Sequence, residues 1–272
     1  MKRGKYSRPS SGGLSRVLGG LFLLLFLVLG TLTLGRLLGQ EKEAQALEQL
    51  QEQVNQETET SPAPTLPEET GIQWTGDSML SRYAPLHAEN PDLFGWLSID
   101  GTRIDYPVMH TPQEPRKYLH RDFGGQEAYA GLPFLDEANG PDSHQLLIYG
   151  HNMANGSMFH DLFQYASRDF WEAHREISLD TLYGSHEFEV VAAFYDRVYL
   201  KTDEVFKFYQ FNRAETEGEY REAVDYYRAN SLYDTGITPE YGDQLLALVT
   251  CAYHVEDGRF VVIARQKKTP DP

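Results

Sequence analysis

Residues 245–264 read LLALVTCAYHVEDGRFVVIA, and this stretch decides the fold class. Two short apolar runs, Leu245–Thr250 and Phe260–Ala264, are rich in leucine and β-branched residues and predict two strands. The loop Cys251–Arg259 connects them. A cysteine at the point where a strand meets a loop is accessible, whereas one in the middle of a strand is not.

Cys251 is the only cysteine among 272 residues, which excludes an intramolecular disulfide and any cysteine-based zinc or iron–sulfur site. It is therefore either an inert buried thiol or a reactive one. Arg259 begins the second predicted strand, where a cation near the thiol would stabilise a thiolate or the oxyanion of a tetrahedral intermediate. The alternative is an arginine exposed on the surface of a hairpin.

A thiol nucleophile needs a partner for proton transfer, and the chain has nine histidines. We expect His87, His174 and His186 on exposed surfaces. His151 differs, because it follows the apolar predicted strand Leu146–Tyr149 with one glycine between. It is another residue at the end of a strand, and it is the candidate proton-transfer group.

The rest of the domain alternates between short aromatic or β-branched runs and turn residues, which predicts a mainly β protein. We expect further strands at 94–99, 102–109, 132–135, 146–149, 176–182 and 187–195. We expect helices at 79–89, 157–165 and 168–175, and a helical insertion at 203–230 before the penultimate strand. The predicted architecture is a closed, mostly antiparallel β-barrel with peripheral helices.

Charge is distributed unevenly along the chain. The first 36 residues carry six of the 24 basic residues and no acid, so 18 basic residues stand against all 40 acidic ones in the remainder. That remainder has a formal charge of −22. A polyanionic body repels nucleic acid, so the sequence excludes nucleic acid as a partner.

The N-terminal region predicts a membrane anchor. Val17–Gly35 is uncharged and rich in leucine, and as a helix it would span roughly 28 Å, close to the hydrocarbon thickness of a bilayer. We assign 1–16 as a basic cytoplasmic tail and 17–38 as a transmembrane helix, with the body outside the cell membrane. The alternative is a cleaved signal peptide, but the run is longer than usual and Ala44-Gln45-Ala46 lies well downstream of it.

A stalk is predicted at 39–73, where a segment rich in Glu and Gln has Leu47, Leu50 and Val54 at helical spacing before a proline-rich stretch. A disordered linker would serve the same purpose. The globular domain is assigned to 74–268 and a short tail to 269–272.

Several of these motifs match one family. Tyr149–Met153 and Asn155–Phe159 resemble the histidine motif of the sortases, and Leu248–Cys251 with Arg259 resembles their cysteine and arginine motifs. Further motifs, in the right order over about 74–268, resemble class B, namely Asn90–Asp92 with Gly95 and Trp96, Ile104–Val108, Ala130 and Gly131 with Phe134 and Asp136, and Tyr233–Gly236. The helical insertion is also typical of class B.

The resemblance implies a cysteine transpeptidase of Gram-positive bacteria, with peptidase and acyltransferase chemistry and no cofactor or metal. Such an enzyme cleaves the C-terminal sorting signal of a secreted protein, often similar to Asn-Pro-x-Thr-Asn, and forms a thioacyl intermediate. It then transfers the acyl group to an amine of a peptidoglycan precursor or of a pilin. By motif, Cys251 is the nucleophile, His151 the general acid and Arg259 the oxyanion clamp.

The sequence departs from the family pattern at two positions. Ala247 replaces the first residue of the usual Thr-Leu-x-Thr-Cys motif, and Tyr253 stands where some class B members have an acidic residue. We therefore assign no third acidic catalytic residue. Thr250, Tyr253 and Asn152 are expected to contact substrate. Two other readings stay open, a membrane-anchored cysteine protease and a non-catalytic surface binding module.

Overall fold

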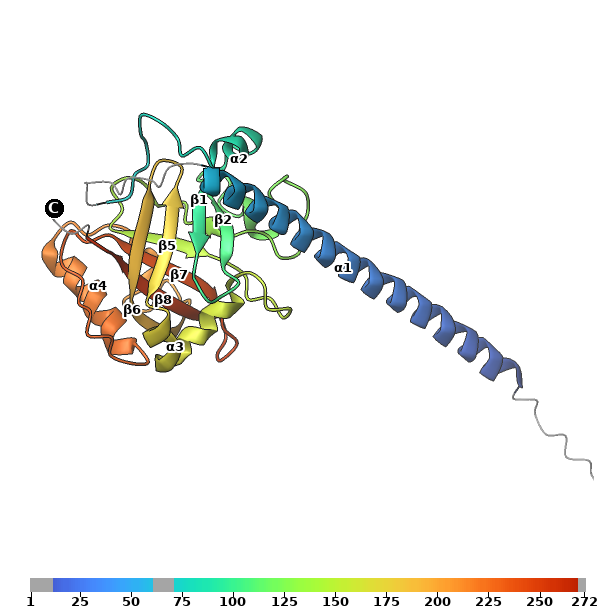
Figure 1. Ribbon diagram of the computed structural model, residues 1–272. Helices are drawn as coiled ribbons and strands as arrows, with labels where there is room; N and C mark the ends of the chain where they lie inside the picture. Colours follow the sequence, from blue (N-terminus) through green and yellow to red (C-terminus); the bar gives the residue numbers. More distant parts are fainter. Residues whose placement is uncertain (1–11, 61–70, 269–272) are drawn as a thin grey trace, which may run out of the picture. The chain divides into compact units, whose positions relative to one another are not determined.

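The computed structural model describes residues 12–60 and 71–268 (Figure 1). Most of the tail assigned to 1–16, part of the stalk assigned to 39–73 and the whole tail 269–272 lie outside the described residues. The chain divides into two compact units, 1–45 and 46–272.

The long helix α1 (Gly12–Thr60) is apolar in its first half. Its leucine and phenylalanine side chains from Leu18 to Leu38 are exposed, and the helix is long and apolar enough to cross a membrane. The helical spacing expected at 47–54 is confirmed, because these residues belong to α1. The assignment of an anchor to 17–38 stays a prediction.

The second unit contains a closed β-barrel, as expected. Its strands are hydrogen-bonded in the order β1-β2-β3-β4-β7-β8-β6-β5. Their bounds are β1 (Leu93–Ser98), β2 (Asp105–Met109), β3 (Phe134–Leu135), β4 (Gln145–Tyr149), β5 (Glu176–Thr181), β6 (Ser185–Arg197), β7 (Leu245–Cys251) and β8 (Gly258–Gln266).

Most neighbouring strands are antiparallel, but two pairs are parallel, β2 with β3 and β4 with β7. The β4–β7 pair is the one that matters for the site. Parallel neighbours need a long crossover connection. Here residues 150–244 supply it, and they include β5, β6 and the helical insertion.

The helices are shorter than expected. Their bounds are α2 (Ala84–Glu89), η1 (Lys117–His120), η2 (Phe159–Ala166), α3 (Arg168–Ala173), η3 (Phe208–Gln210) and α4 (Glu217–Asn230). The prediction of a helix from residue 79 was wrong by five residues, because Pro85 suits the first turn of α2. Only part of 203–230 is helical: α4 begins after Thr216, whose side chain accepts a hydrogen bond from the Glu219 N–H.

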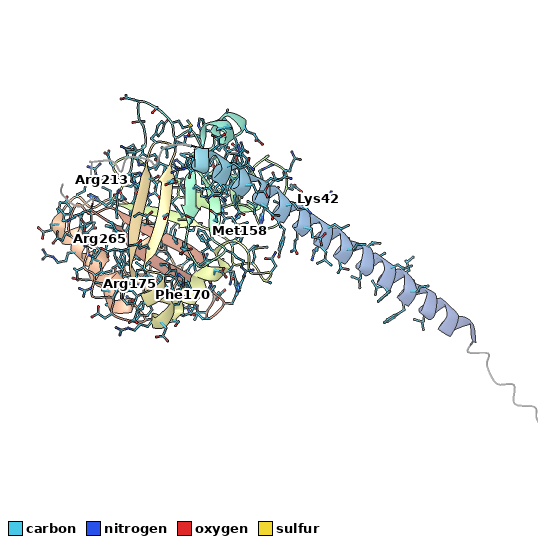
Figure 2. The ribbon with its side chains drawn as sticks, viewed as in Figure 1. Lys42, Met158, Phe170, Arg175, Arg213 and Arg265 are labelled. Atoms are coloured by element: carbon cyan, nitrogen blue, oxygen red, sulfur yellow. The ribbon has the colours of Figure 1, made fainter. Side chains whose placement is uncertain are left out.

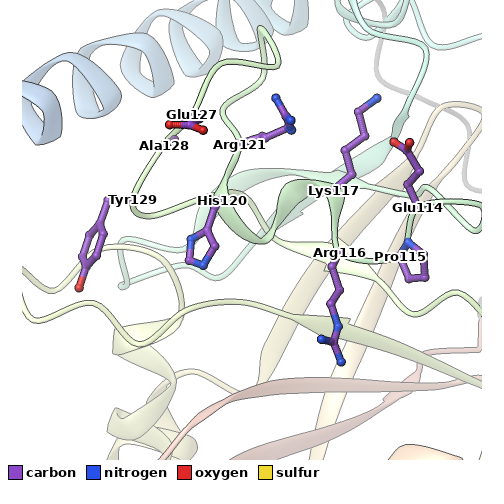
Figure 3. A pocket seen from close by; sticks show the side chains of 9 residues that line it. All are labelled: Glu114, Pro115, Arg116, Lys117, His120, Arg121, Glu127, Ala128 and Tyr129. Carbon is purple, nitrogen blue, oxygen red and sulfur yellow. The ribbon is translucent and has the colours of Figure 1, made fainter.

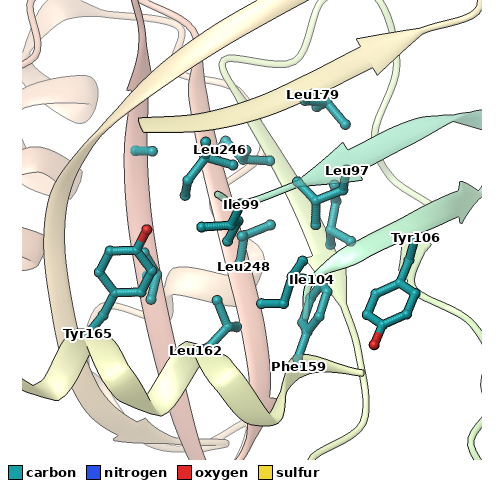
Figure 4. Close-up of a cluster of buried hydrophobic side chains, with 14 of the residues drawn as sticks. Leu97, Ile99, Ile104, Tyr106, Phe159, Leu162, Tyr165, Leu179, Leu246 and Leu248 are labelled. Atoms are coloured by element: carbon teal, nitrogen blue, oxygen red, sulfur yellow. The ribbon is translucent and has the colours of Figure 1, made fainter. Parts of the chain in front are cut away.

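Both faces of β7 and β8 are buried, which explains why their sequences are continuously apolar and do not alternate. Leu246 and Leu248 point into the barrel, where they join the interior core (Figure 4). Leu245, Ala247 and Val249 point outward into a second cluster, which the insertion covers with Val224, Tyr220 and Tyr227 of α4. The insertion therefore shields the outer face of the strands that carry the candidate site.

The expectation that three histidines lie on exposed surfaces was wrong. His87 and His174 are half-buried, and His186 is only 2% exposed. Strand β6 begins earlier than predicted, and His186 pairs in register with the buried Leu179, so both side chains point to the same buried face. Its Nε2 accepts a hydrogen bond from the Gln73 N–H, and Gln266 contacts its Nδ1 at 3.1 Å.

Candidate active site

Strand register brings three predicted residues to the same end of three neighbouring strands. In the parallel pair of β4 and β7, Tyr149 lies beside Val249, and the Gly150 N–H donates to the Val249 carbonyl. His151 lies two residues beyond Tyr149, just as Cys251 lies two residues beyond Val249. In the antiparallel pair of β7 and β8, Cys251 lies opposite Arg259.

Alternation along the strands puts this site on the outer face of the barrel. Val249 belongs to the outer cluster, so Cys251, two residues on, lies on the same face. Val261 of β8 also faces outward, and so does Arg259 two residues before it. The cysteine is half-buried there, at the end of β7.

A cleft with a volume of about 420 Å³ covers this face. His151, Thr250, Cys251 and Arg259 all line it. The insertion contributes Phe208 and Tyr209 to its wall, and Val198, the residue after β6, adds to it. Side chains from the end of three strands and from the insertion therefore enclose one cavity large enough for a peptide segment.

The His151 ring is oriented by a backbone carbonyl. Its Nε2 lies 2.9 Å from the carbonyl oxygen of Leu119, at the end of η1. A carbonyl only accepts, so Nε2 carries its hydrogen and Nδ1 is the nitrogen free to exchange a proton. Burial lowers the pKa of His151 below its usual range and the neighbouring His120 lowers it further, while the bond to Leu119 opposes them. The neutral ring is therefore the major form at pH 7.

Arg259 keeps its charge available to the cleft. Its Nη1 donates to the carbonyl oxygens of Gly258 at 2.8 Å and Asp257 at 3.2 Å. No carboxylate pairs with it within residues 12–60 and 71–268. The guanidinium is thus held in place by neutral groups, and its field reaches as far as the Tyr149 hydroxyl, whose pKa it lowers against a larger rise caused by burial.

The loop after His151 is tied to the cysteine. Asn152 Nδ2 donates to the carbonyl oxygen of Cys251 at 3.1 Å, and its Oδ1 lies 2.8 Å from Nδ1 of His160. Met158, labelled in Figure 2, pairs with Asn152 and has a φ of 55°, a conformation uncommon for a residue with a side chain. The loop therefore folds back on itself, and the side-chain amide of Asn152 joins the end of β4 to the end of β7.

The three predicted substrate contacts lie in different surroundings. Thr250 lines the cleft, and its hydroxyl donates to the Gly150 carbonyl at 2.8 Å. Asn152 is engaged by protein groups and does not line the cleft. Tyr253 is 84% exposed in the loop after β7, outside the residues that line the cleft. A role for each in binding substrate stays a prediction.

Two residues of η1 contact His151 without having been predicted from the sequence. Leu119 supplies the carbonyl for His151, and the His120 ring stacks on His151. A backbone carbonyl has no signature in sequence, and η1 lies about 30 residues before His151 with no strand or helix pattern of its own. Among the described residues, no three His, Cys, Asp or Glu side chains gather as metal ligands.

Comparison with known proteins gives consistent matches. A family model described as the sortase domain matches residues 97–267. Sortase B of Listeria monocytogenes is 31% identical over 177 residues, which cover 64% of this chain and 69% of that protein. Sortase B of Staphylococcus aureus is 27% identical over 191 residues, or 68% of this chain and 74% of that protein.

Solved structures agree with the fold. A Bacillus anthracis protein described as similar to sortase B is 26% identical, with a TM-score of 0.67, and the match covers 84% of this chain and 97% of that one. The substrate complex of Staphylococcus aureus sortase B has a TM-score of 0.70 at 23% identity, covering 85% and 99%. At 23% identity, the match to the Staphylococcus aureus complex supports the fold alone.

Proposed function

This chain belongs to the sortase family, as a class B cysteine transpeptidase of cell-wall sorting, and from this premise we propose the roles of its residues. Cys251 is the nucleophile, His151 the proton-transfer group and Arg259 the group that stabilises the oxyanion. The observation that supports this proposal is the register at the cleft. Cys251 lies opposite Arg259 and is joined to the loop of His151 through the Asn152 amide.

In the first half-reaction the thiolate of Cys251 attacks the carbonyl carbon of the scissile peptide bond. The carbonyl oxygen becomes an oxyanion beside the Arg259 guanidinium, which is free of any carboxylate among the described residues. The C–N bond then breaks, and Nδ1 of His151 gives its proton to the leaving amine. A thioacyl enzyme and a released peptide result.

In the second half-reaction an amine of the acceptor attacks the thioester carbonyl. His151, now neutral, takes the proton of the attacking amine at Nδ1, and the C–S bond breaks to return the thiolate. A new amide bond replaces the old one, so the reaction needs no oxidant or external energy source. Because neutral His151 predominates at pH 7, only a minority of molecules hold the proton that the first step requires.

We further propose that the donor is a sorting signal similar to Asn-Pro-x-Thr-Asn, and that the acceptor is an amine of a peptidoglycan precursor or a pilin. The cleft supports a peptide donor: its wall combines apolar residues such as Leu132 and Val198 with polar ones such as Asp136 and Arg259. A substrate complex is known for the Staphylococcus aureus enzyme, whose fold this chain shares.

The test is to incubate the full chain, in detergent, with a panel of sorting-signal peptides and, separately, with amines. We expect mass spectrometry to detect a thioacyl adduct on Cys251 with at least one peptide, and an amide product once an amine is added. Cys251→Ala is the control and should form neither. Hydrolysis of unrelated proteins without any adduct would instead favour a cysteine protease and overturn the proposal.

We also propose that 17–38 anchors the enzyme in the cell membrane with its N-terminus in the cytoplasm and the catalytic unit outside. The support is the exposed apolar surface of α1 together with basic residues and no acid in the first 36 residues. Protease added to intact cells with the wall removed should digest the catalytic unit and spare an N-terminal tag. The reverse pattern would refute the orientation.

A further inference from the structure

Two histidines from different segments face each other at the edge of the cleft. The ring centroids of His120 and His151 lie 5.4 Å apart with an interplanar angle of 21°, a stacked arrangement. His151 is also bonded to the carbonyl of Leu119, the neighbour of His120. One turn of η1 therefore contacts the His151 ring twice, once at a nitrogen and once on a face.

The two rings differ in their access to solvent. His151 lies half-buried in the cleft with Cys251 and Arg259. His120 is exposed and lines an adjoining pocket of about 880 Å³, shown in Figure 3. The two cavities share Pro115 and Arg116. His120 thus forms part of the partition between the cleft and a pocket that is open to bulk water.

The other charged or titratable groups that line the pocket around His120 are Glu114, Arg116, Lys117, Arg121, Glu127 and Tyr129. Lys117 is paired with Asp92, and Arg121 donates to the Gly125 carbonyl. Arg116 points away from Arg121 and Glu127 in Figure 3. His120 therefore lies on the solvent-exposed side of this pocket, beside Lys117 and Arg121, which are engaged by other groups.

We propose that His120 is a positioning residue for His151, whose ring fixes the plane of the His151 imidazole and whose charge sets the pH range in which His151 holds its transferable proton. The proposal rests on the function proposed above. A hydrogen bond at Nε2 alone leaves the ring free to turn about the axis of that bond. The stacked ring of His120 restricts this rotation, so Nδ1 of His151 points in one fixed direction.

The charge of His120 acts in a definite direction. When both rings are protonated they repel each other at short range, so the charged form of His120 favours loss of the proton from His151. This agrees with the lowered pKa of His151, to which His120 contributes after burial. Removing the charge while keeping a stacked ring should therefore raise the pKa of His151.

The test compares His120→Phe, which keeps a stacked ring without charge, with His120→Ala, which removes both. We expect His120→Ala to lower kcat for thioacyl formation roughly 10- to 100-fold, with KM for the peptide little changed, because the imidazole loses its alignment. His120→Phe should restore most of this rate. In addition, the limb of its pH profile that reports loss of the His151 proton should move to higher pH, and the NMR titration of the His151 ring should move the same way.

His87→Ala is the matched control, a half-buried histidine on α2 that should change neither quantity. If wild-type rates and pH profiles persist in both His120 variants, the inference is wrong while the proposed function stands. If the unmodified chain forms no adduct on Cys251, the proposed function itself fails. Should thermal unfolding show that His120→Ala does not fold, the pH profile and NMR titration of His120→Phe decide, and an unshifted titration rejects the proposal.

Discussion

The cleft and the end of β5 each contain an arginine with ordered hydrogen bonds. The two arginines differ in whether a carboxylate neutralises their charge. Near β5, Arg82 donates to Asp180 at 2.8 Å and to the Ser185 hydroxyl at 2.7 Å, and Tyr83 donates to the same carboxylate. We call these four residues the paired network. In the cleft, Arg259 donates to two backbone carbonyls, and no carboxylate in the described part of the chain pairs with it.

The difference separates structural from reactive charge. A carboxylate neutralises the guanidinium of the paired network, and breaking such a buried pair leaves an uncompensated charge. Backbone carbonyls hold a guanidinium in place without neutralising it, so its positive field remains for a substrate oxyanion. His151 follows the same pattern as Arg259, since a carbonyl rather than a carboxylate orients it. Backbone acceptors thus fix the positions of the Arg259 and His151 side chains without neutralising the positive charge in the cleft.

The largest expected effect is at the thiol. Cys251→Ala should reduce transpeptidation roughly 10⁴-fold or more, because it removes the only thiol of the chain from the cleft. The thermal midpoint should change little, since Cys251 is half-buried at a strand end. Peptide turnover measured by chromatography, beside a melting curve, checks both. Retained turnover would place the nucleophile elsewhere.

The next effect contrasts the two arginines directly. Arg259→Met should lower kcat roughly 10²- to 10³-fold by removing oxyanion stabilisation, with little loss of stability because no carboxylate is left unpaired. Arg259→Lys should recover only part of the rate, since an ammonium lacks the planar fork. Steady-state kinetics and urea unfolding measure the two quantities. A large loss of stability in Arg259→Met would make its role structural and abolish the contrast.

The opposite result is expected in the paired network. Arg82→Met should lower the free energy of unfolding by about 3 kcal/mol, because the side chains of Arg82 and Asp180 are only 10% and 19% exposed. The molecules that remain folded should transfer peptide at the normal rate. Urea unfolding with an activity assay in buffer tests this, and the double variant Arg82→Met with Asp180→Leu should regain part of the lost stability.

The smallest effect concerns the two histidine environments. Burial lowers the pKa of His186 to about 4, so between pH 6.5 and 4 the unfolded chain binds a proton that the folded chain does not. Stability therefore falls as the pH falls, by about 2 kcal/mol between pH 7 and pH 5 from this group alone. His186→Gln should flatten this part of the curve, and His87→Gln should not. An unchanged slope in His186→Gln would assign the pH dependence to other groups.

Much of the fold follows from the sequence because most strands have a recognisable local pattern of apolar and β-branched residues. The runs that ended at Thr250 and began at Phe260 predicted β7 and β8, and their strand-end positions singled out Cys251 and Arg259. The prediction failed where non-local packing decides. Residues 203–216 have aromatic residues at helical spacing, but Phe208 is buried against the barrel as part of a short 3₁₀ turn rather than a helix.

The candidate site was predictable only in part for the same reason. His151 could be identified by its place after a strand, but its neighbours could not. Leu119 contributes a carbonyl and His120 a ring from η1, a distant segment whose contact with His151 no local pattern encodes. His186 was placed on the surface because its strand was predicted to begin one residue after it. Register, rather than composition, decides what surrounds each histidine.

The parallel pairing of β4 with β7 also has a consequence for how the molecule forms. The bond from Asn152 to the Cys251 carbonyl joins residues 99 positions apart, and residues 150–244 separate the two paired strands along the chain. Contacts of such long range are entropically costly to close and form slowly. The thiol therefore meets His151 only when the barrel closes, so the cysteine of an incompletely folded chain lacks its proposed partner for proton transfer.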